Sequence, residues 1–480
     1  MGVRGELSME LRVELKEDHT MQASRARPTL SRTSLVRGSV LLAAATLAQA
    51  CAGRGGSGAS TVTEQARQLT KERITLTWAM PGGGGSAEED TYKAAAAKFS
   101  EKYPNITVEQ APSGRSEQLA RVAGGRPDDV MFSTINDAAS WIEQGVFLGL
   151  DALIRRDKFD IDDFFPEILK PYRYDGKGYG HGDLYGLPKE IAVRAMYYNK
   201  TIFDKEGIKP PPPDRPWDWN EFLQMTRQVT KRDGDTVTQW GYVQEDWWGM
   251  WMIWAWSNGG EAVDDPYKPT RSTMTQPQVV EALQFWADFQ ARLRVAPNAD
   301  DLKAMNANSK VAAFAMGKIA TYNNGRWNVP LLRQVRDFEW DVMPMPVSPT
   351  TKQRAQLLTG SIFAVAAGSK YREETWELLK FAMGKEGMTF LTDLGVLQPS
   401  RKSVAQSDVF MKKAPPVNNR IFFDEIPVAR VLPIHPFYSD MANEIDTRVR
   451  NEVLRGTKSA KQAIEEFTPL VDQILKKTVK

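Results

Sequence analysis

The stretch "RITLTWAMPGGGGSAEEDTYKAAAAKFSEKYPNITVEQAP" (residues 73–112) decides the fold class of this chain. Its first part, Arg73–Met80, alternates apolar and polar side chains as a strand does, and a proline and four glycines end it. The next part, Ala87–Pro104, is rich in helix formers, begins with acidic residues and stops at a proline. A second strand pattern, "ITVEQAP", follows. The order strand, helix, strand predicts layers of helices on a sheet.

The same alternation continues towards the C-terminus. The segment Gly186–Phe203 runs from a glycine-containing turn into a β-branched and aromatic strand, and amphipathic helices are expected from near Trp217 and over Gln278–Leu293. Gln356–Gly368 has the pattern of one long buried strand. Strands that alternate with helices predict an α/β fold with a largely parallel sheet. At 480 residues the chain is long enough for two or more lobes.

The composition excludes several classes of function. The formal charge is only +2, which argues against a nucleic-acid surface, and three histidines leave little for metal chemistry. No H-E-x-x-H, G-x-S-x-G or P-loop motif is present, so the sequence implies no metal and no cofactor. A glycosidase would need two carboxyl groups flanking the scissile bond. Acidic pairs do occur, but helix capping or a turn explains each of them: Asp128-Asp129, Asp162-Asp163 and Asp424-Glu425.

The N-terminal region has the features of an export signal. Four arginines between residues 25 and 37 precede the apolar stretch Ser39–Ala50, and the next residue, Cys51, is the only cysteine of the chain. We expect residues 1–51 to form a signal peptide that ends at a lipidation cysteine, and residues 52–71 to form a flexible Gly/Ser-rich tether. Ala48-Gln49-Ala50 would also serve as an ordinary cleavage site, which would release the protein. Residues 1–20 are acidic for a signal, so translation from Met21 stays open.

Five tryptophans fall within ten residues of "DWWGMWMIWAWSNGGE" (Asp246–Glu261). The apolar run is about half the ~20 residues that a membrane-spanning helix needs. Two interpretations remain, a crowded core helix and a surface that stacks on an apolar ligand face. In a helix Trp247, Trp251 and Trp254 share one face, with Trp248 to its side. We expect some of the five to lie in the core and one or two to form a stacking wall.

Six stretches occur in an order that resembles the family 1 extracellular solute-binding proteins of ABC sugar importers. The resemblance runs from about residue 74 to residue 475. It rests on "AAAAKFSEKYPNITVE", "PDDVMFSTINDAASWIEQGVFLGLDALI", "LYGLPKEIAVRAMYYNKTIFDKEGI", "WDWNEFLQMTRQVT", "GKIATYNNGRWN" and "TWELLKFAMGKEGMTFLTDLGVLQPSR". It implies a two-lobed α/β fold of the type II periplasmic-binding-protein kind. A ligand cleft lies between the lobes, and hinge strands let them close around a sugar.

The resemblance also implies a lobe organisation in which the chain crosses more than once. We expect residues 72–193 and 358–402 to form lobe 1, and residues 194–357 and 403–480 to form lobe 2. The crossings are then expected near Arg194–Asn199, Val342–Leu358 and Gln398–Ser407.

Sugar binding needs aromatic faces for the C–H side of a pyranose and polar groups for its hydroxyls. The resemblance makes Trp327, in "GRWN", the first stacking candidate, although a buried anchor between strand and helix is the alternative. Arg326 beside it would reach a hydroxyl or form an ion pair at the rim. Tyr438 is a second stacking aromatic by family position. Trp248 or Trp251 would face the cleft, with Asn258 on the following turn.

Three further candidates come from the first lobe. Asn136 falls where the family places a polar sugar contact, with helix capping by Asn136 or Asp137 as the alternative. Glu190 lies beside the first crossing strand, together with Arg194, although charges near a hinge also occur without a ligand. Gly360 would let the backbone approach the ligand, and a β-bulge explains it equally well.

These features predict the extracytoplasmic substrate-binding component of an ABC importer, and not an enzyme. It would capture a sugar or oligosaccharide as a monomer, deliver it to the permease subunits, and touch the membrane only through the lipid on Cys51. A protein of the same fold for glycerol phosphate, a polyamine or a peptide is the first alternative. A sugar phosphate as ligand would favour additional arginines in the cleft, which Arg194, Arg326 and Arg401 make possible. A secreted carbohydrate-active enzyme is the second alternative.

Overall fold

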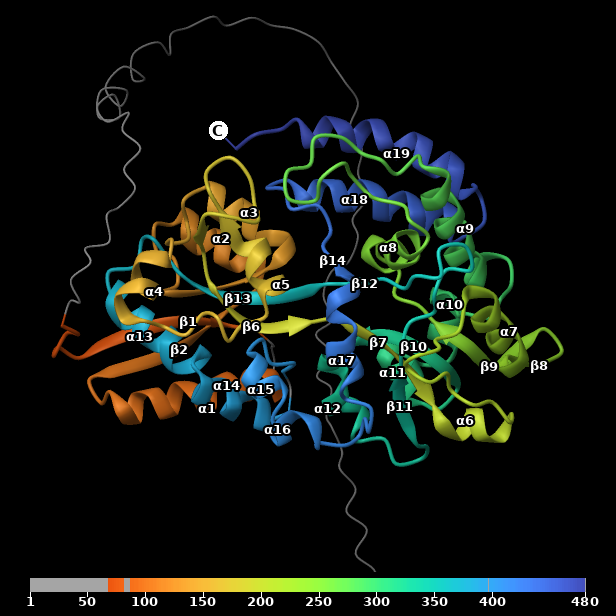
Figure 1. Cartoon of the computed structure of the whole chain (residues 1–480), viewed down its shortest axis with the longest axis horizontal. Coiled ribbons are helices and arrows are strands. Elements are labelled where there is room, and N and C mark those ends of the chain that lie inside the picture. Colours follow the sequence, from red (N-terminus) through yellow and green to blue (C-terminus); the bar gives the residue numbers. More distant parts are fainter. Residues whose placement is uncertain (1–67, 82–86, 396, 480) are drawn as a thin grey trace, which may run out of the picture. The chain divides into compact units, whose positions relative to one another are not determined.

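Two five-stranded mixed sheets organise the chain (Figure 1). The computed structural model describes residues 68–81, 87–395 and 397–479. The predicted signal peptide with Cys51, most of the predicted tether and the glycines of "PGGGGS" therefore lie outside the described residues. Within them, no helix is long and apolar enough to cross a membrane.

The first sheet has the strand order β2-β1-β3-β13-β6. Strand β1 pairs in parallel with β2 and β3, whereas β13 is antiparallel to both β3 and β6. The strands are β1 (Ile74–Met80), β2 (Ile106–Pro112), β3 (Val130–Thr134), β6 (Leu187–Ala192) and β13 (Thr359–Val365).

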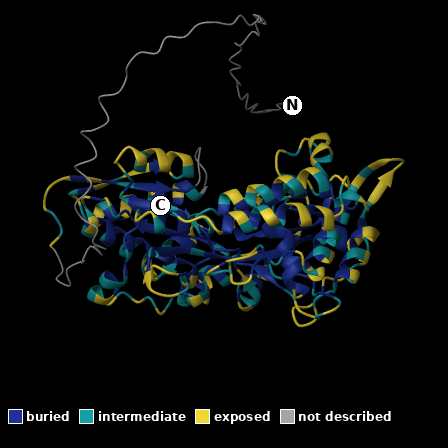
Figure 2. Ribbon diagram, turned by 90° about the horizontal axis from the view of Figure 1, so that it is seen from above, coloured by how far each residue is buried: buried dark blue, intermediate teal, exposed yellow. Residues whose placement is uncertain are grey.

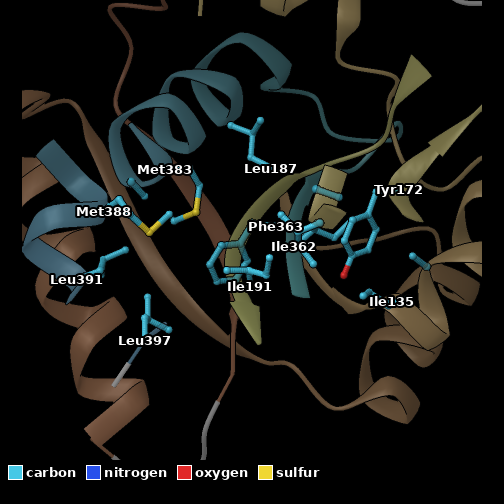
Figure 3. Close-up of a cluster of buried hydrophobic side chains, with 14 of the residues drawn as sticks. Ile135, Tyr172, Leu187, Ile191, Ile362, Phe363, Met383, Met388, Leu391 and Leu397 are labelled. Atoms are coloured by element: carbon cyan, nitrogen blue, oxygen red, sulfur yellow. The ribbon is translucent and has the colours of Figure 1, made fainter. Parts of the chain in front are cut away.

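Helices cover both faces of the first sheet. In Figure 1, α1 and α14 lie below it and α2 and α3 lie above it. Figure 3 shows side chains of β13 (Ile362, Phe363) and β6 (Leu187, Ile191) meeting those of the helices in one buried cluster. The helices are α1 (Ala87–Lys102), α2 (Arg115–Ala123), α3 (Ile135–Glu143), α13 (Arg372–Met383) and α14 (Lys385–Asp393). The strand and helix predicted from residues 73–104 are therefore confirmed to within two residues at each end.

The second sheet has the strand order β11-β7-β10-β9-β8. Here β10 is parallel to β9 and antiparallel to β7, and β11 is also antiparallel to β7. The strands are β7 (Arg194–Asn199), β8 (Lys231–Asp233), β9 (Thr236–Val243), β10 (Ile319–Gly325) and β11 (Trp340–Met343). Its larger helices are α7 (Trp219–Val229), α8 (Trp248–Ser257), α9 (Pro277–Ala291), α18 (Tyr438–Arg448) and α19 (Ala460–Leu475).

Shorter elements connect these parts. The short strands are β4 (Arg173–Tyr174), β5 (Asp183–Leu184), β12 (Gln356–Leu357) and β14 (Ala429–Arg430). The short helices are α4 (Asp151–Asp157), α5 (Pro166–Leu169), α6 (Lys200–Lys205), α10 (Ala299–Ala304), α11 (Lys310–Ala315), α12 (Val329–Leu332), α15 (Lys402–Ala405), α16 (Asp408–Met411) and α17 (Ile421–Asp424). Single-turn 3-10 helices occupy Lys170–Tyr172, Arg326–Asn328 and Ile426–Val428, and a π-helix occupies Val449–Val453.

The chain passes directly from one sheet to another at two places. Only Val193 separates β6 of the first sheet from β7 of the second, and only Leu358 separates β12, which pairs with β14 in a two-stranded sheet, from β13 of the first sheet. The two passages are bonded to each other, because Gln356 Nε2 donates to the Arg194 carbonyl at 2.8 Å and Thr359 Oγ1 donates to the Ala192 carbonyl at 3.1 Å.

These passages correct two expectations. The predicted single strand Gln356–Gly368 is two strands in different sheets, since β12 pairs with β14 while β13 joins the first sheet. A largely parallel sheet is also wrong. Strands β7 and β13 each follow the preceding strand after a single residue, without the crossover helix that joins parallel neighbours, and both pair antiparallel in their sheets.

Buried residues form two hydrophobic cores. The first core contains the residues around the first sheet and also residues of the second sheet such as Tyr197 and Trp240, whereas the second core contains Tyr198 and Tyr242 and the residues around α8. Figure 2 shows the strands as largely buried and the exposed residues along the outer sides of the helices. Helix α8 differs from the others because all ten of its residues are buried. It contacts α9 and α18, and the second core surrounds it.

Candidate functional site

The candidate site lies where the parallel strands β9 and β10 end. Residues Glu245, Asp246 and Trp247 follow β9, while Tyr322 and Asn324 lie in the second half of β10. The carboxyl ends of parallel strands meet at one edge of a sheet, which is where open α/β sheets bind ligands. A cavity of about 550 Å³ opens here, and its lining includes Glu245, Lys310, Tyr322, Asn324 and Trp327.

Glu245 is the centre of a polar network in this cavity. Its Oε1 accepts from Tyr322 Oη at 2.5 Å and from Asn324 Nδ2 at 2.9 Å. Lys310 Nζ lies 3.8 Å from Glu245 Oε2 and 2.7 Å from Asp246 Oδ1. Burial, together with the neighbouring Glu245 carboxylate, raises the pKa of Tyr322 well above its ordinary value, so this hydroxyl stays protonated as a donor. The network offers fixed donors and acceptors of the kind that sugar hydroxyls require.

Trp327 presents an indole to the cavity. It is 39% exposed, unlike the buried residues on both sides of it. A Cβ on Gly325 would come within 1.9 Å of Trp327 Cζ3, so only glycine at 325 leaves room for the ring. The alternative of a buried anchor does not fit this exposure. That Trp327 stacks on a ligand stays a prediction, and its position in the cavity lining supports it.

Arg194, the first residue of β7, lies between two indoles. Its Cζ is 5.3 Å from the ring centroid of Trp247 and 5.4 Å from that of Trp327. The residue is only 4% exposed, and its one side-chain hydrogen bond among the described residues is a 3.5 Å contact to Thr359 Oγ1. Burial lowers the pKa of the guanidinium to about 10, against the opposing influence of Glu245. It therefore remains charged at neutral pH.

Tyr438 and Trp248 contact each other and are buried rather than exposed to the cavity. Trp248 Nε1 donates to Tyr438 Oη at 3.0 Å, and the two rings lie 5.9 Å apart. The Trp248 amide donates to Asp446 Oδ1 at 2.6 Å, so α18 fixes the start of α8 twice. Burial is the main cause that raises the pKa of Tyr438 far above its ordinary value, and Arg194 is among the charges that act on it. Tyr438 thus lies near Arg194 but is almost entirely buried.

Helix α18 also contacts helix α3 of the first sheet. Arg115 donates to Ser439 Oγ at 3.1 Å and pairs with Asp137, which lies beside the predicted site residue Asn136. Asn136 is half-buried on α3 and has no side-chain hydrogen bond within the described residues. The cap residue of α3 is Thr134, and no side chain caps this helix, so capping by Asn136 or Asp137 is wrong.

Two predicted residues of the first sheet have partners in the protein. Glu190 on β6 accepts from Ser361 Oγ at 2.8 Å and lies 3.0 Å from Lys189 Nζ. Gly360 approaches Ile168 and the Glu190 carbonyl closely and pairs with Ile191, and the pairing of β13 with β6 shifts register only between Ser361 and Ile362. The β-bulge explanation for Gly360 stays a prediction. A ligand contact by either residue stays a prediction.

Three further predicted residues are buried away from the cavity lining. Trp251 has no exposed surface and lies in the second core. Asn258 donates to Glu281 Oε2 at 2.9 Å and accepts from Ser348 Oγ at 2.9 Å. Arg326 forms neither a rim ion pair nor an open contact, since it donates to the carbonyls of Gly395 and Leu397 at 3.0 and 3.3 Å. We do not include these three in the site proposed below.

Sequence reasoning missed most of the polar residues of the site. Glu245, Lys310, Tyr322 and Asn324 were not candidates, and Trp247 was assigned to the face of a helix that begins only after it. One available signal was the run of polar residues at the ends of two neighbouring strands, "VQED" and "YNNG".

In each of the three acidic pairs that a glycosidase could use, one carboxylate forms an ion pair with an arginine of the protein. Asp128 pairs with Arg121 at 2.6 Å, Asp163 with Arg401 at 3.2 Å, and Glu425 with Arg354 at 2.9 Å. No group of three or more His, Cys, Asp or Glu side chains in the described part of the chain is arranged to hold a metal ion.

Two mixed sheets joined by the direct passage from β6 to β7, with a cavity at the strand ends of one of them, define the two-lobed class of solute-binding proteins. A family model described as "bacterial extracellular solute-binding protein" matches residues 94–418, and the chain belongs to this family. Its members bind solutes outside the cytoplasm and are not enzymes.

Individual known proteins agree with this assignment. The chain is 23% identical over 334 residues to an arabinooligosaccharide-binding protein of Halalkalibacterium halodurans, covering 65% of this chain and 69% of that protein. The structure resembles an ABC substrate-binding protein of Listeria monocytogenes in complex with cycloalternan, with a TM-score of 0.73, 21% identity, and coverage of 84% of this chain and 98% of that one. It also resembles UgpB of Mycobacterium tuberculosis in complex with glycerophosphocholine, with a TM-score of 0.70, 17% identity, and coverage of 85% and 99%. The two-lobed α/β fold is thereby confirmed.

Proposed function

We propose that this protein is the substrate-binding component of an ABC importer that captures a sugar or oligosaccharide outside the cytoplasm. One observation carries the proposal. An exposed indole, Trp327, lies at the same cavity as the hydrogen-bonding network around Glu245. An aromatic face covers the C–H side of a pyranose, and fixed donors and acceptors bind its hydroxyls. The arabinooligosaccharide-binding relative and the cycloalternan complex support a carbohydrate as the ligand.

The proposal includes closure of two lobes. Residues 72–193 and 358–402 would form lobe 1, and residues 194–357 and 403–480 would form lobe 2. The passages at Val193 and Leu358 would act as the hinge, since a few residues at the ends of elements absorb such motions. The closed protein would deliver the sugar to the permease as a monomer, without chemical change. Lipidation of Cys51 would hold it at the membrane, and cleavage at Ala48-Gln49-Ala50 would instead release it.

A thermal-shift screen of the purified protein tests this function. Mono- and oligosaccharides are compared with sugar phosphates, polyamines and peptides. A ligand at a hundredfold excess over its Kd stabilises the folded state by about 2.7 kcal/mol, which raises the Tm. We expect a shift with one carbohydrate class, and we expect Trp327→Ala to lose it.

The matched control is Leu331→Ala, because Leu331 is similarly exposed, at 42%, one helical turn beyond Trp327. This variant is expected to keep the shift. A shift with polyamines or peptides and with no carbohydrate would leave the fold intact and remove the sugar assignment.

A further inference from the structure

Arg194 is a buried cation whose charge has no carboxylate partner in the described part of the chain. Within the described residues, no carboxylate oxygen lies within 4.0 Å of it, its Nε has no acceptor, and its contact to Thr359 Oγ1 is 3.5 Å long. It is nevertheless 96% buried, with the indoles of Trp247 and Trp327 as neighbours. Because burial of an unpaired charge is unfavourable, the position calls for an anionic partner that the protein itself does not supply.

Two other largely buried cations, Lys189 and Lys310, have carboxylate partners. Lys189 lies 2.8 Å from Glu88 and 3.0 Å from Glu190. Lys310 lies 2.7 Å from Asp246 and 3.8 Å from Glu245. The Glu245 carboxylate is further occupied by Tyr322 and Asn324. Arg194, by contrast, has no such partner among the described residues.

Two other buried arginines show how this chain places a guanidinium for structural purposes. Arg401 donates to the carbonyls of Met383 and Asp160 and forms an ion pair with Asp163. Arg326 donates to two carbonyls and faces Phe410, away from the cavity, although its Nε is also unbonded. Arg194 has no such backbone bonds in the described structure. Its donors therefore have no structural role that would occupy them.

We propose that Arg194 recognises an anionic group, a carboxylate or a phosphate, on the ligand that lies against Trp327. The inference rests on the proposed function and narrows its substrate class to acidic carbohydrates. A guanidinium offers a planar fork of N–H donors that matches a carboxylate or phosphate in two parallel hydrogen bonds. The flanking indoles hold this fork in place and, at Trp327, supply the apolar face for the sugar ring that carries the anion.

The experiment compares ligands that differ only in charge. Isothermal titration of the purified protein uses trigalacturonate against α-1,4-galactotriose, glucuronate or glucose 6-phosphate against glucose, and sn-glycerol 3-phosphate against glycerol. We expect at least one acidic member to bind about tenfold or more tighter than its neutral counterpart, in line with the strength of charge-assisted hydrogen bonds. The carboxylate and phosphate arms separate the two sources of the anion.

The variants assign this preference to one residue. Arg194→Gln is expected to lower the affinity for the acidic ligand about 30-fold and that for a neutral sugar about threefold or less, since only the charged fork is lost. Arg194→Lys keeps the charge but not the fork and is expected to fall between. The matched control is Lys303→Gln, which removes a positive charge from an exposed residue of the same cavity lining and is expected to leave the ratio unchanged.

Each outcome decides between the two proposals. Neutral sugars that bind as tightly as acidic ones overturn the role of Arg194 and leave sugar binding intact. Glycerol phosphate that binds without any carbohydrate, and is lost in Arg194→Gln, removes the sugar and keeps the anion site. Binding of nothing in the series overturns the role of Arg194, and the thermal-shift screen then decides sugar binding separately. If Arg194→Gln fails to fold, the ligand preference of the wild-type protein and Arg194→Lys still decide the question.

Discussion

The tryptophans of α8 and the single tryptophan of the "GRWN" turn have opposite environments. Trp248, Trp251, Trp254 and Trp256 are buried to within 3% of their surface, whereas Trp327 is 39% exposed. Helix α8 is apolar on every side and is surrounded by α9, α18 and the second core. A helix that is hydrophobic all round belongs inside a protein. Trp327 is instead an isolated aromatic between polar and glycine residues, and the backbone makes room for its exposure.

The comparison shows that the segment richest in tryptophan is not the segment whose tryptophan is accessible to a ligand. The Trp-rich segment suggested a stacking wall, yet only Trp247, which precedes the helix, lies beside the candidate site. If the contrast is functional, substitutions around α8 lower stability, whereas substitutions at the Trp327 turn lower ligand affinity.

The largest effect is expected from Trp251→Ala in the core. Removal of a fully buried indole costs about 3–5 kcal/mol of unfolding free energy, since transfer and cavity terms add. The same change at exposed Trp327 is expected to cost less than about 1 kcal/mol. Urea denaturation of both variants, followed by circular dichroism, measures the difference. Similar losses at the two positions would show that Trp327 is a packing residue as well.

The sequence was sufficient where structure is decided locally. The strand and helix of residues 73–104 were predicted because alternation, acidic start and proline end all lie within the segment. The helix expected near Trp217 begins at Trp219, where Asp218 and Glu221 form a capping box. These signals depend on neighbours in the chain, and no tertiary contact is needed to interpret them.

Other features depend on contacts between distant segments, and the sequence alone did not indicate them. Nothing in "QLLTGSIFAVAAG" shows that Leu357 pairs with Arg430 while Thr359 pairs with Ala192. Likewise, the three arginines considered for an anionic ligand look alike in sequence. Only the structure shows that Arg326 and Arg401 donate to carbonyls and that Arg194 does not.

A smaller effect is expected from the carboxylate that anchors the start of α8. Burial raises the pKa of Asp446 from its ordinary 3.8 to about 6, with the Trp248 amide and Arg450 acting in the opposite direction and Asp246 in the same one. The folded state therefore binds this proton more tightly than the unfolded state. The contribution of Asp446 protonation to the unfolding free energy therefore falls as pH rises from about 4 to about 6. Above pH 6 the buried carboxylate is charged, and the full cost of burying that charge is present.

The variant Asp446→Asn keeps an oxygen acceptor for the Trp248 amide and removes the titration. The unfolding free energy of the variant minus that of the wild type is expected to rise by about 2 kcal/mol between pH 4 and pH 7. Urea denaturation at pH 4, 5, 6 and 7 checks this gain. A constant offset between the two proteins at all four values would contradict the linkage.

The smallest effect on stability, and the most selective test of the comparison, is expected from Gly325→Ala. The backbone at Gly325 is extended, with φ −85° and ψ 173°, so alanine is permitted there. Its Cβ would, however, lie 1.9 Å from Trp327 Cζ3 and would displace the exposed ring. We expect the unfolding free energy to change by less than about 1 kcal/mol and ligand affinity to fall about tenfold, as for loss of one aromatic contact.

The control for this change is Gly178→Ala, where the added Cβ would meet nothing closer than Lys268 Cδ at 3.7 Å. Titration calorimetry of both variants with the ligand found in the screen separates ring displacement from a general effect of alanine. If Gly325→Ala bound as well as the wild type, the position of the Trp327 ring would not matter for capture, and the contrast between the two tryptophan regions would be one of burial alone. A loss of affinity confined to Gly325→Ala would instead show that a single glycine sets the orientation of the Trp327 ring at the binding surface. The pattern of aromatic residues in the sequence does not indicate this role.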